Sequence, residues 1–288
     1  AACAWFAAAD VSANSYPLIT HSAVNLLTEF GNDDQKRRYL EPMVAGRFFG
    51  TMCLSEPQAG SSLSDIQLRA EPTTDGHYLI KGTKMWISGG EHELSENIVH
   101  LVLAKIPGGP PGVKGISLFV VPKIRVNDDG TLGARNNVQL VSLNHKMGFR
   151  GITNTVLNFG EGGECHGWLV GPMHQGLFCM FRMMNEMRIG IGMAACVLGY
   201  TAYLHSLKYA RERPQGRHPL EKNPASPQVP IIQHADIKRL LLAQKSAAEG
   251  AFTLLLHCAW LIDRQRTETD DAERTRIVLI LHELKPIG

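Results

Sequence analysis

The 288-residue sequence lacks the features that mark several classes of protein. It contains no block of like charges and its formal net charge is only +2, which disfavours a nucleic-acid-binding surface and a polybasic membrane anchor. No uninterrupted apolar run reaches the roughly eighteen residues that a membrane span needs, and residues 1–9 lack the charged start of a signal peptide. No Gly-x-Gly-x-x-Gly motif follows a predicted strand, so a Rossmann-type dinucleotide site is disfavoured.

Cysteine pairs of the Cys-x-x-Cys type are also absent. The six cysteines lie far apart in the sequence, which predicts reduced, mostly buried thiols and a cytoplasmic location. The only tight cluster of metal-ligand types is Glu91-His92-Glu93, which has neither a second histidine one helical turn on nor a cysteine pair. We therefore predict no metal site.

The pattern of the residues that are present changes twice along the chain. Residues 22–30 are amphipathic and stop at Gly31, Asn32 offers an N-cap oxygen to the next helix, and Gly46 can end that helix. A series of short β-branched and aromatic runs follows, separated by Gly, Pro and Asn clusters. After Gly176, apolar residues recur at helical spacing, apart from a Pro- and Gly-rich loop at 213–230.

These patterns predict an α+β fold with three domains. Residues 1–49 are helical, residues 50–167 form an antiparallel β-barrel or sandwich, and residues 168–288 form a helical bundle. The predicted strands span residues 50–55, 77–81, 85–88, 98–104, 116–121 and 153–159.

The stretch from Thr51 to Ser88 has the character of a ligand-binding wall. An apolar run breaks at Pro57 into a turn of small residues, where a ligand can approach the backbone closely. A second run, from 78 to 88, is predicted to be a short hairpin that ends at Trp86, Ile87 and Ser88 before a double glycine.

Two motifs in this stretch resemble the flavin-binding core of the acyl-CoA dehydrogenases. They are Leu54-Ser55-Glu56-Pro57-Gln58-Ala59-Gly60-Ser61 and Lys84-Met85-Trp86-Ile87-Ser88-Gly89. Together with Gly-Ile-Ser-Leu-Phe-Val-Val-Pro at 115–122 and Met-Asn-Glu-Met-Arg at 184–188, they are most similar to the 3-methylmercaptopropionyl-CoA dehydrogenase branch. The resemblance covers nearly all of the chain, and it implies that residues 1–49 are the end of a helical domain.

This resemblance implies FAD as the cofactor. Met52, Leu54 and Ser55 would meet the pyrimidine side of the flavin, mainly through backbone groups, and residues 86–88 would meet its dimethylbenzene and N5 side. Arg213 would bind the FAD pyrophosphate of a neighbouring subunit, although Gly216 stands where the family has an aromatic residue. The cofactor-binding residues implied are Met52, Leu54, Ser55, Trp86, Ile87, Ser88, Arg213 and Gln233.

The resemblance also implies a CoA thioester as the substrate. The matching positions are Ser61, Met184, Asn185 and Arg188. The family's glutamate base lies in a C-terminal Glu-Gly-Thr motif that this sequence does not contain. In some relatives the base comes immediately before the arginine that matches Arg188. Here that position is Met187, which cannot accept a proton. Glu186 is a poor substitute, because one residue on a helix turns the side chain about 100° to another face.

The reaction implied is the oxidation of an acyl-CoA to the trans-2-enoyl-CoA, with electrons passed to an electron-transfer flavoprotein by a homodimer or homotetramer. Two alternatives stay open: a flavin-containing relative that associates with nucleic acid under stress, and a truncated product with no activity. The ends of the sequence lead us to expect a fragment, because it begins without Met in an Ala-rich stretch typical of a buried helix and stops just after another helical pattern.

Overall fold

The computed structural model describes residues 2–218 and 220–284 and divides into two compact units. One unit is Ser12–Met187, and the other combines Ala1–Val11 with Arg188–Gly288. What the sequence predicted for Pro219 and for residues 285–288 lies outside the described residues. The three-domain limits stay a prediction, whereas the α+β class with a central β-domain is confirmed.

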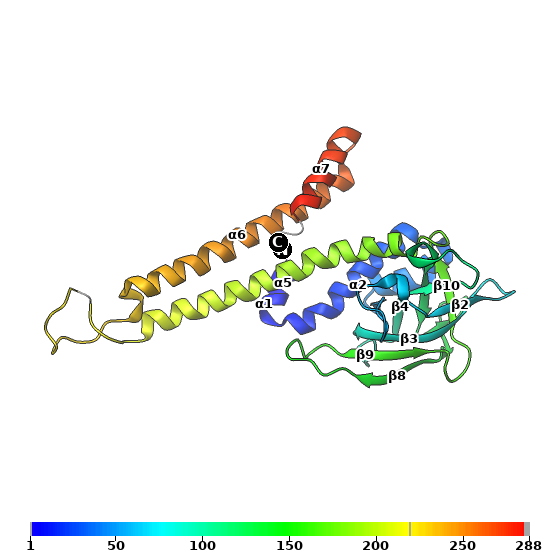
Figure 1. Cartoon of the computed structure of the whole chain (residues 1–288), viewed down its shortest axis with the longest axis horizontal. Helices are drawn as coiled ribbons and strands as arrows, with labels where there is room; N and C mark the ends of the chain where they lie inside the picture. The colour runs from blue at the N-terminus through cyan, green and yellow to red at the C-terminus, as the bar shows by residue number, and fades with distance from the viewer. Residues whose placement is uncertain (1, 219, 285–288) are drawn as a thin grey trace. The chain divides into compact units, whose positions relative to one another are not determined.

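The unit of residues 12–187 is built around one large sheet (Figure 1). Its strands are β1 (Phe48–Cys53), β2 (Arg69–Pro72), β3 (Tyr78–Ser88), β4 (Asn97–Lys105), β5 (Ile116–Pro122), β8 (Val138–Leu143), β9 (Asn154–Phe159) and β10 (His166–Val170); β6 (Ile124–Val126) and β7 (Leu132–Arg135) form a separate pair. The order in the sheet is β1-β4-β5-β10-β3-β9-β8, and β2 pairs with both β3 and β4. Strands β4, β5, β10, β3 and β2 therefore form a closed ring. β1 and β2 run parallel to β4, and the other pairs are antiparallel.

Strands β4 and β5 are buried on both faces. Val102 and Phe119 point into the barrel core, while Leu101 and Leu118 face a second core formed with the helices. A strand covered on both faces carries a continuous apolar run instead of an alternating one, which is why both strands could be predicted from sequence.

The helices that cover this sheet are α2 (Val11–Phe30), the continuous turns α3 (Asp33–Gln35), η1 (Lys36–Leu40) and α4 (Glu41–Val44), and the beginning of α5 (Gly176–Glu212). The predicted cap is confirmed: the Asn32 side chain accepts from the Gln35 N–H at 2.8 Å, and Gln35 reciprocates. Gly46, with a φ of +75°, follows the last turn as expected. Helix α2 begins well before residue 22 and contains Pro17, so the predicted helix was too short.

The predicted hairpin between residues 78 and 88 is wrong. β3 runs as a single strand through Gly82, whose φ of +142° is a conformation that residues with side chains rarely adopt. A side chain at Gly82 would press on Leu68 from 3.1 Å, so the glycine here permits close packing of two segments instead of a turn.

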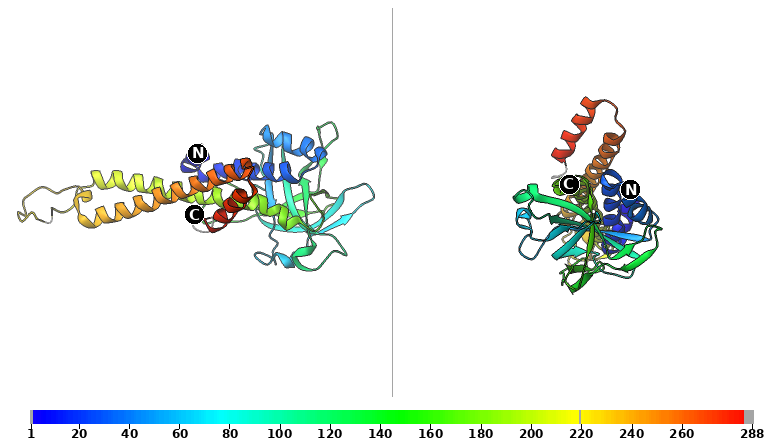
Figure 2. Two further views of the ribbon diagram at one scale, coloured as in Figure 1. Left: turned by 90° about the horizontal axis from the view of Figure 1, so that it is seen from above. Right: turned by 90° about the vertical axis from the view of Figure 1, so that its right-hand side faces the viewer.

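The unit of residues 1–11 and 188–288 is helical. It contains α1 (Ala2–Ala9), the rest of α5, the short turn η4 (Ile231–Gln233), α6 (Ala235–Thr267) and α7 (Asp271–Leu284). Helices α5 and α6 run side by side (Figure 2), and the Cys196 thiol donates to the Ala248 carbonyl. Residues 213–230 are loop where described, as predicted.

Large apolar side chains remain exposed in this helical unit. α1 forms over the Ala-rich stretch, but Trp5 and Phe6 are exposed, so it is not the fully buried helix that the sequence suggested. By length and composition alone, α5 is apolar enough to cross a membrane.

Candidate active site

The two predicted halves of the ligand-binding wall lie against each other. The Met85 N–H donates to the Ser55 carbonyl at 2.9 Å, which joins the end of β1 to β3. Met52 and Leu54 point to the helix-covered face, where they pack against the same core as Met184 of α5. The structure therefore brings together several of the residues that the sequence singled out.

A buried ion pair that the sequence reasoning missed fixes this junction. The Lys84 ammonium lies 2.9 Å from the Glu56 carboxylate and donates to the Leu54 carbonyl at 2.8 Å. Both side chains are buried, with 0% and 3% exposed. The carboxylate also accepts the backbone N–H groups of Gln67 and Leu68, so one ion pair ties β1, β3 and the approach to β2 together.

The electrostatics of this pair follow from its burial and its partners. Burial lowers the pKa of Lys84 below its usual value, although the Glu56 charge opposes the shift. Burial works to raise the pKa of Glu56, but the Lys84 charge and the backbone donors outweigh it, so that this pKa lies below its usual value. The Glu56 carboxylate is therefore ionised near neutral pH, and its hydrogen-bond partners tie it to the fold.

Trp86 occupies a strained and exposed position. Between Lys84 and Ile87, β3 contains one more residue than its partner β9, which is a β-bulge. Trp86 sits in this bulge with a φ of 64°, a left-handed conformation that bulky residues rarely adopt, and 55% of its surface is exposed. The bulge therefore turns a large aromatic ring outward, beside the end of β1.

The residues after Trp86 divide between the core and the surface. The Ile87 side chain is buried in the barrel, Ile87 is paired with Thr155 of β9, and its carbonyl accepts from the Thr155 hydroxyl. The Ser88 hydroxyl accepts a hydrogen bond from Asn154 at 3.3 Å. Gly89 then takes a φ of +66°. Ser61 lies in the exposed turn that follows the Glu56–Ala59 bridge.

The predicted substrate residues on α5 are only partly buried. Met184 and Asn185 are half-buried, and Arg188 is exposed. The Glu186 carboxylate accepts a hydrogen bond of 2.6 Å from the Asn25 amide on α2. Glu186 is thus tied to a neighbouring helix, and its low rank as a base stays a prediction.

Arg213 and Gln233 lie close together in the helical unit. The Arg213 carbonyl accepts from the Ile231 N–H at 2.9 Å, and Gln233 ends the same short turn, η4. Both side chains are exposed. They lie at one end of the α5–α6 pair.

No group of three metal-ligating side chains occurs among residues 2–218 and 220–284. A buried histidine does lie in the barrel: His100 Nδ1 is 2.7 Å from the Thr51 hydroxyl, and burial lowers the pKa of His100 to about 3. The neighbouring Cys53 thiol is held inert, because burial raises its pKa to about 12.

Comparison with known proteins gives a consistent result. Residues 51–161 match the family model described as acyl-CoA dehydrogenase, middle domain. The chain is 44% identical over 255 residues to the 3-methylmercaptopropionyl-CoA dehydrogenase of Ruegeria pomeroyi, covering 88% of this chain but 42% of that protein. The chain thus spans about two fifths of the length of this relative.

Solved structures show the same fold. The butyryl-CoA dehydrogenase of Megasphaera elsdenii superposes with a TM-score of 0.76 and 22% identity, covering 99% of this chain and 66% of that one. An acyl-CoA dehydrogenase of Bacillus anthracis, solved with FAD, gives a TM-score of 0.69 and 22% identity, covering 91% of this chain and 41% of that one.

Proposed function

Because this chain belongs to the acyl-CoA dehydrogenase family, we propose that it carries the flavin-binding wall of an enzyme that oxidises an acyl-CoA thioester to the trans-2-enoyl-CoA. The observation that carries the proposal is Trp86, an exposed ring held in a strained conformation beside the Leu54–Ser55 strand end. Such strain persists where the surrounding structure imposes it, and it clusters at ligand sites. Bound FAD would accept the hydride that leaves the substrate's Cβ.

The wall offers complementary groups to a flavin. Trp86 supplies an apolar face that excludes water from the ring. The Ser88 hydroxyl accepts from Asn154, which leaves its own proton to donate toward the ligand. Ser55 has its carbonyl engaged by Met85, so its hydroxyl and N–H are the groups that we assign to the cofactor.

The substrate-binding residues that we propose lie in the turn after Glu56 and on α5. Met184 packs against the core that also contacts Met52 and Leu54, so an acyl chain beside α5 would lie near the wall. Ser61, Asn185 and Arg188 would bind the polar part of the thioester. We do not assign proton abstraction to Glu186, because its carboxylate is engaged by Asn25.

The enzyme that we propose is a homodimer or homotetramer that passes electrons to an electron-transfer flavoprotein. Support for self-association comes from the exposed apolar side chains of the helical unit, which include Leu198, Leu204, Leu242, Trp260 and Leu279. A reducing cytoplasmic location is proposed because none of the six cysteines, all within the described residues, forms a disulfide.

The test is the visible absorption spectrum of the purified chain under anaerobic conditions, before and after addition of a short acyl-CoA. Flavin absorption that bleaches with acyl-CoA, but not with free CoA, is the expected result for the complete half-reaction. Flavin that stays oxidised would show a functional cofactor wall without a base in this chain. A protein that binds no FAD when the cofactor is added would refute the proposal.

A further inference from the structure

Three basic side chains lie in register on the outer face of the barrel. Arg69 of β2 is directly opposite Lys81 of β3 on one side and Lys105 of β4 on the other. Leu68 and Ala70, which flank Arg69, belong to the barrel core, so Arg69 points outward. Like charges directly opposite each other destabilise a sheet. We call Lys81, Arg69 and Lys105 the basic row.

The charge of the basic row is not neutralised within the part of the chain that the structure describes. The side chains of Arg69 and Lys81 form no ion pair or hydrogen bond there. Lys105 donates to the Ser64 carbonyl at 2.6 Å, which leaves two of its protons free. Glu71 lies two residues along the outward face of β2 but forms no ion pair with the row among the described residues. The row therefore retains an excess of positive charge.

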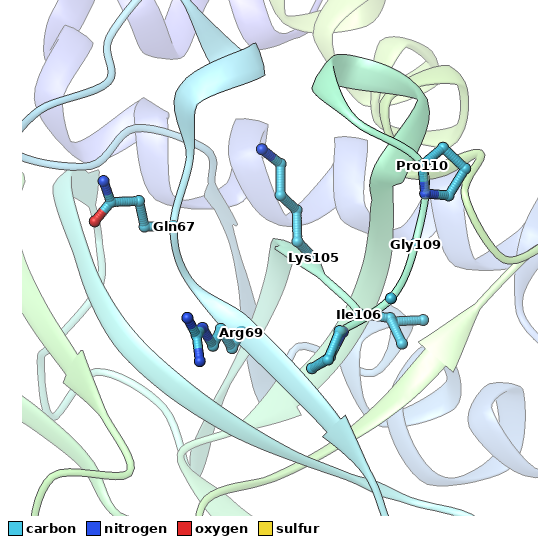
Figure 3. A pocket seen from close by; sticks show the side chains of 8 residues that line it. Gln67, Arg69, Lys105, Ile106, Gly109 and Pro110 are labelled. Atoms are coloured by element: carbon cyan, nitrogen blue, oxygen red, sulfur yellow. The ribbon is translucent and has the colours of Figure 1, made fainter.

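A cavity of about 530 Å³ lies beside this row (Figure 3). Gln67, Arg69 and Lys105 line one side, and the Ile-Pro-Gly-Gly-Pro loop at 106–110 lines the other. Gly108 has a φ of +80°, and a side chain at Gly109 would come within 2.7 Å of the His174 ring. The loop thus needs both glycines for its own conformation, and their bare backbone lets a ligand approach closely.

We propose that Arg69, Lys105 and Gln67 bind a phosphate-bearing anion in this cavity, with Lys81 adding positive charge beside it. A guanidinium matches two phosphate oxygens at once, and Lys105 adds a point charge at the cavity wall. A phosphate dianion would convert the repulsion along the row into attraction. The binding chemistry requires neither flavin nor an acyl group, so it goes beyond the proposed oxidation. The phosphate belongs either to the nucleotide end of a CoA thioester or to a separate phosphorylated molecule.

The test is a calorimetric titration of the full chain with inorganic phosphate at constant ionic strength. Saturable binding to the unmodified chain is expected, and Arg69→Gln should weaken it about tenfold, since charge-assisted hydrogen bonds are lost. The matched control is Lys222→Gln, which removes an exposed lysine from the 213–230 loop and should leave binding unchanged. Absence of saturable binding, or an equal loss in the control, would overturn the proposal.

A stability measurement separates binding from a structural role of Arg69. Without phosphate, Arg69→Gln should raise the thermal unfolding midpoint, because repulsion along the basic row is relieved. With phosphate, the midpoint of the unmodified chain should rise and that of the variant should not. A variant that is less stable without phosphate would instead show that Arg69 serves the fold.

Competition distinguishes the two sources of the phosphate. CoA that displaces phosphate, while pantetheine does not, would place the CoA nucleotide at the basic row and would deepen the proposed function. Phosphate binding that persists at saturating CoA would assign the cavity to a separate molecule. Because these titrations need no turnover, their failure is distinguishable from a failure of the proposed oxidation.

Discussion

The two units of this chain differ in the kinds of side chain that they bury. In residues 12–187 a lysine and a glutamate are buried together, and backbone groups of Leu54, Gln67 and Leu68 complete their hydrogen bonds. In the helical unit, by contrast, Leu242 and Leu279 are 65% and 61% exposed. The unit of residues 12–187, here called the β-unit, thus buries a charged pair and supplies its hydrogen-bond partners, whereas the side chains buried in the described part of the helical unit are apolar.

The largest effect should come from breaking the buried pair. We expect Lys84→Met to lower the free energy of unfolding by about 3–5 kcal/mol, because it leaves the Glu56 carboxylate buried without its cation. The change is measured as the shift of the urea unfolding midpoint. In the double variant Lys84→Met/Glu56→Gln no charge is left unpaired, so much of the loss should be recovered. A double variant as unstable as the single one would show that the ion pair is not the cause.

The buried His100 should make the β-unit sensitive to acid. Its folded-state pKa of about 3 lies below the usual value, so between about pH 6.5 and 3 the unfolded chain binds a proton that the folded chain does not. Stability should therefore fall as pH falls through this window, by a few kcal/mol, and the slope should end near pH 3. Unfolding midpoints measured from pH 7 to 4 check this. His100→Gln should flatten the profile, and an unchanged slope would contradict the assignment.

The exposed apolar surface of the helical unit can be tested by placing a charge on it. Leu242→Glu should weaken self-association about tenfold, because it places a charge in an apolar surface that we expect to be covered. The stability of the unassociated chain should change little, since the side chain is already exposed. Sedimentation equilibrium measures the association, with Lys222→Glu as the control. Equal association of both variants would argue that this surface stays uncovered.

The smallest effect should follow from removing the helix cap. We expect Asn32→Ala to destabilise the β-unit by about 1 kcal/mol, because the Gln35 N–H loses its acceptor at the helix start. Asn32→Ser keeps a capping oxygen and should recover most of the loss. Chemical denaturation of the three proteins decides the matter, and an alanine variant of unchanged stability would show that the cap is dispensable.

Sequence patterns predicted the parts of the fold whose burial is continuous or strictly periodic. Strands β4 and β5, the cap at Asn32 and the long helices α5 and α6 were predicted correctly. The prediction missed β2, β6, β7, β8 and β10. Three of these have weak patterns: β7 is exposed throughout, β8 is exposed after its first residue, and β2 has only four residues and includes Pro72. Each of these three pairs with a strand next to it in the sequence, so they were missed because of weak burial patterns, not distant partners.

The site was predicted only in outline. The two motifs located the end of β1 and the end of β3. The structure shows a backbone hydrogen bond from the Met85 N–H to the Ser55 carbonyl between them. The ion pair between Glu56 and Lys84 was missed although both residues lie within the quoted motifs, because charged side chains are expected at the surface. The bulge at Trp86 was missed because its cause is a register shift against β9, which is a tertiary contact.

The most direct test of the account is FAD binding by Trp86→Gly, measured by flavin fluorescence titration together with thermal unfolding. Glycine adopts a left-handed φ without strain, so we predict a variant that unfolds at a higher temperature yet binds FAD at least tenfold more weakly. A variant with unchanged FAD affinity would contradict the claim that this strained, exposed ring forms the flavin wall.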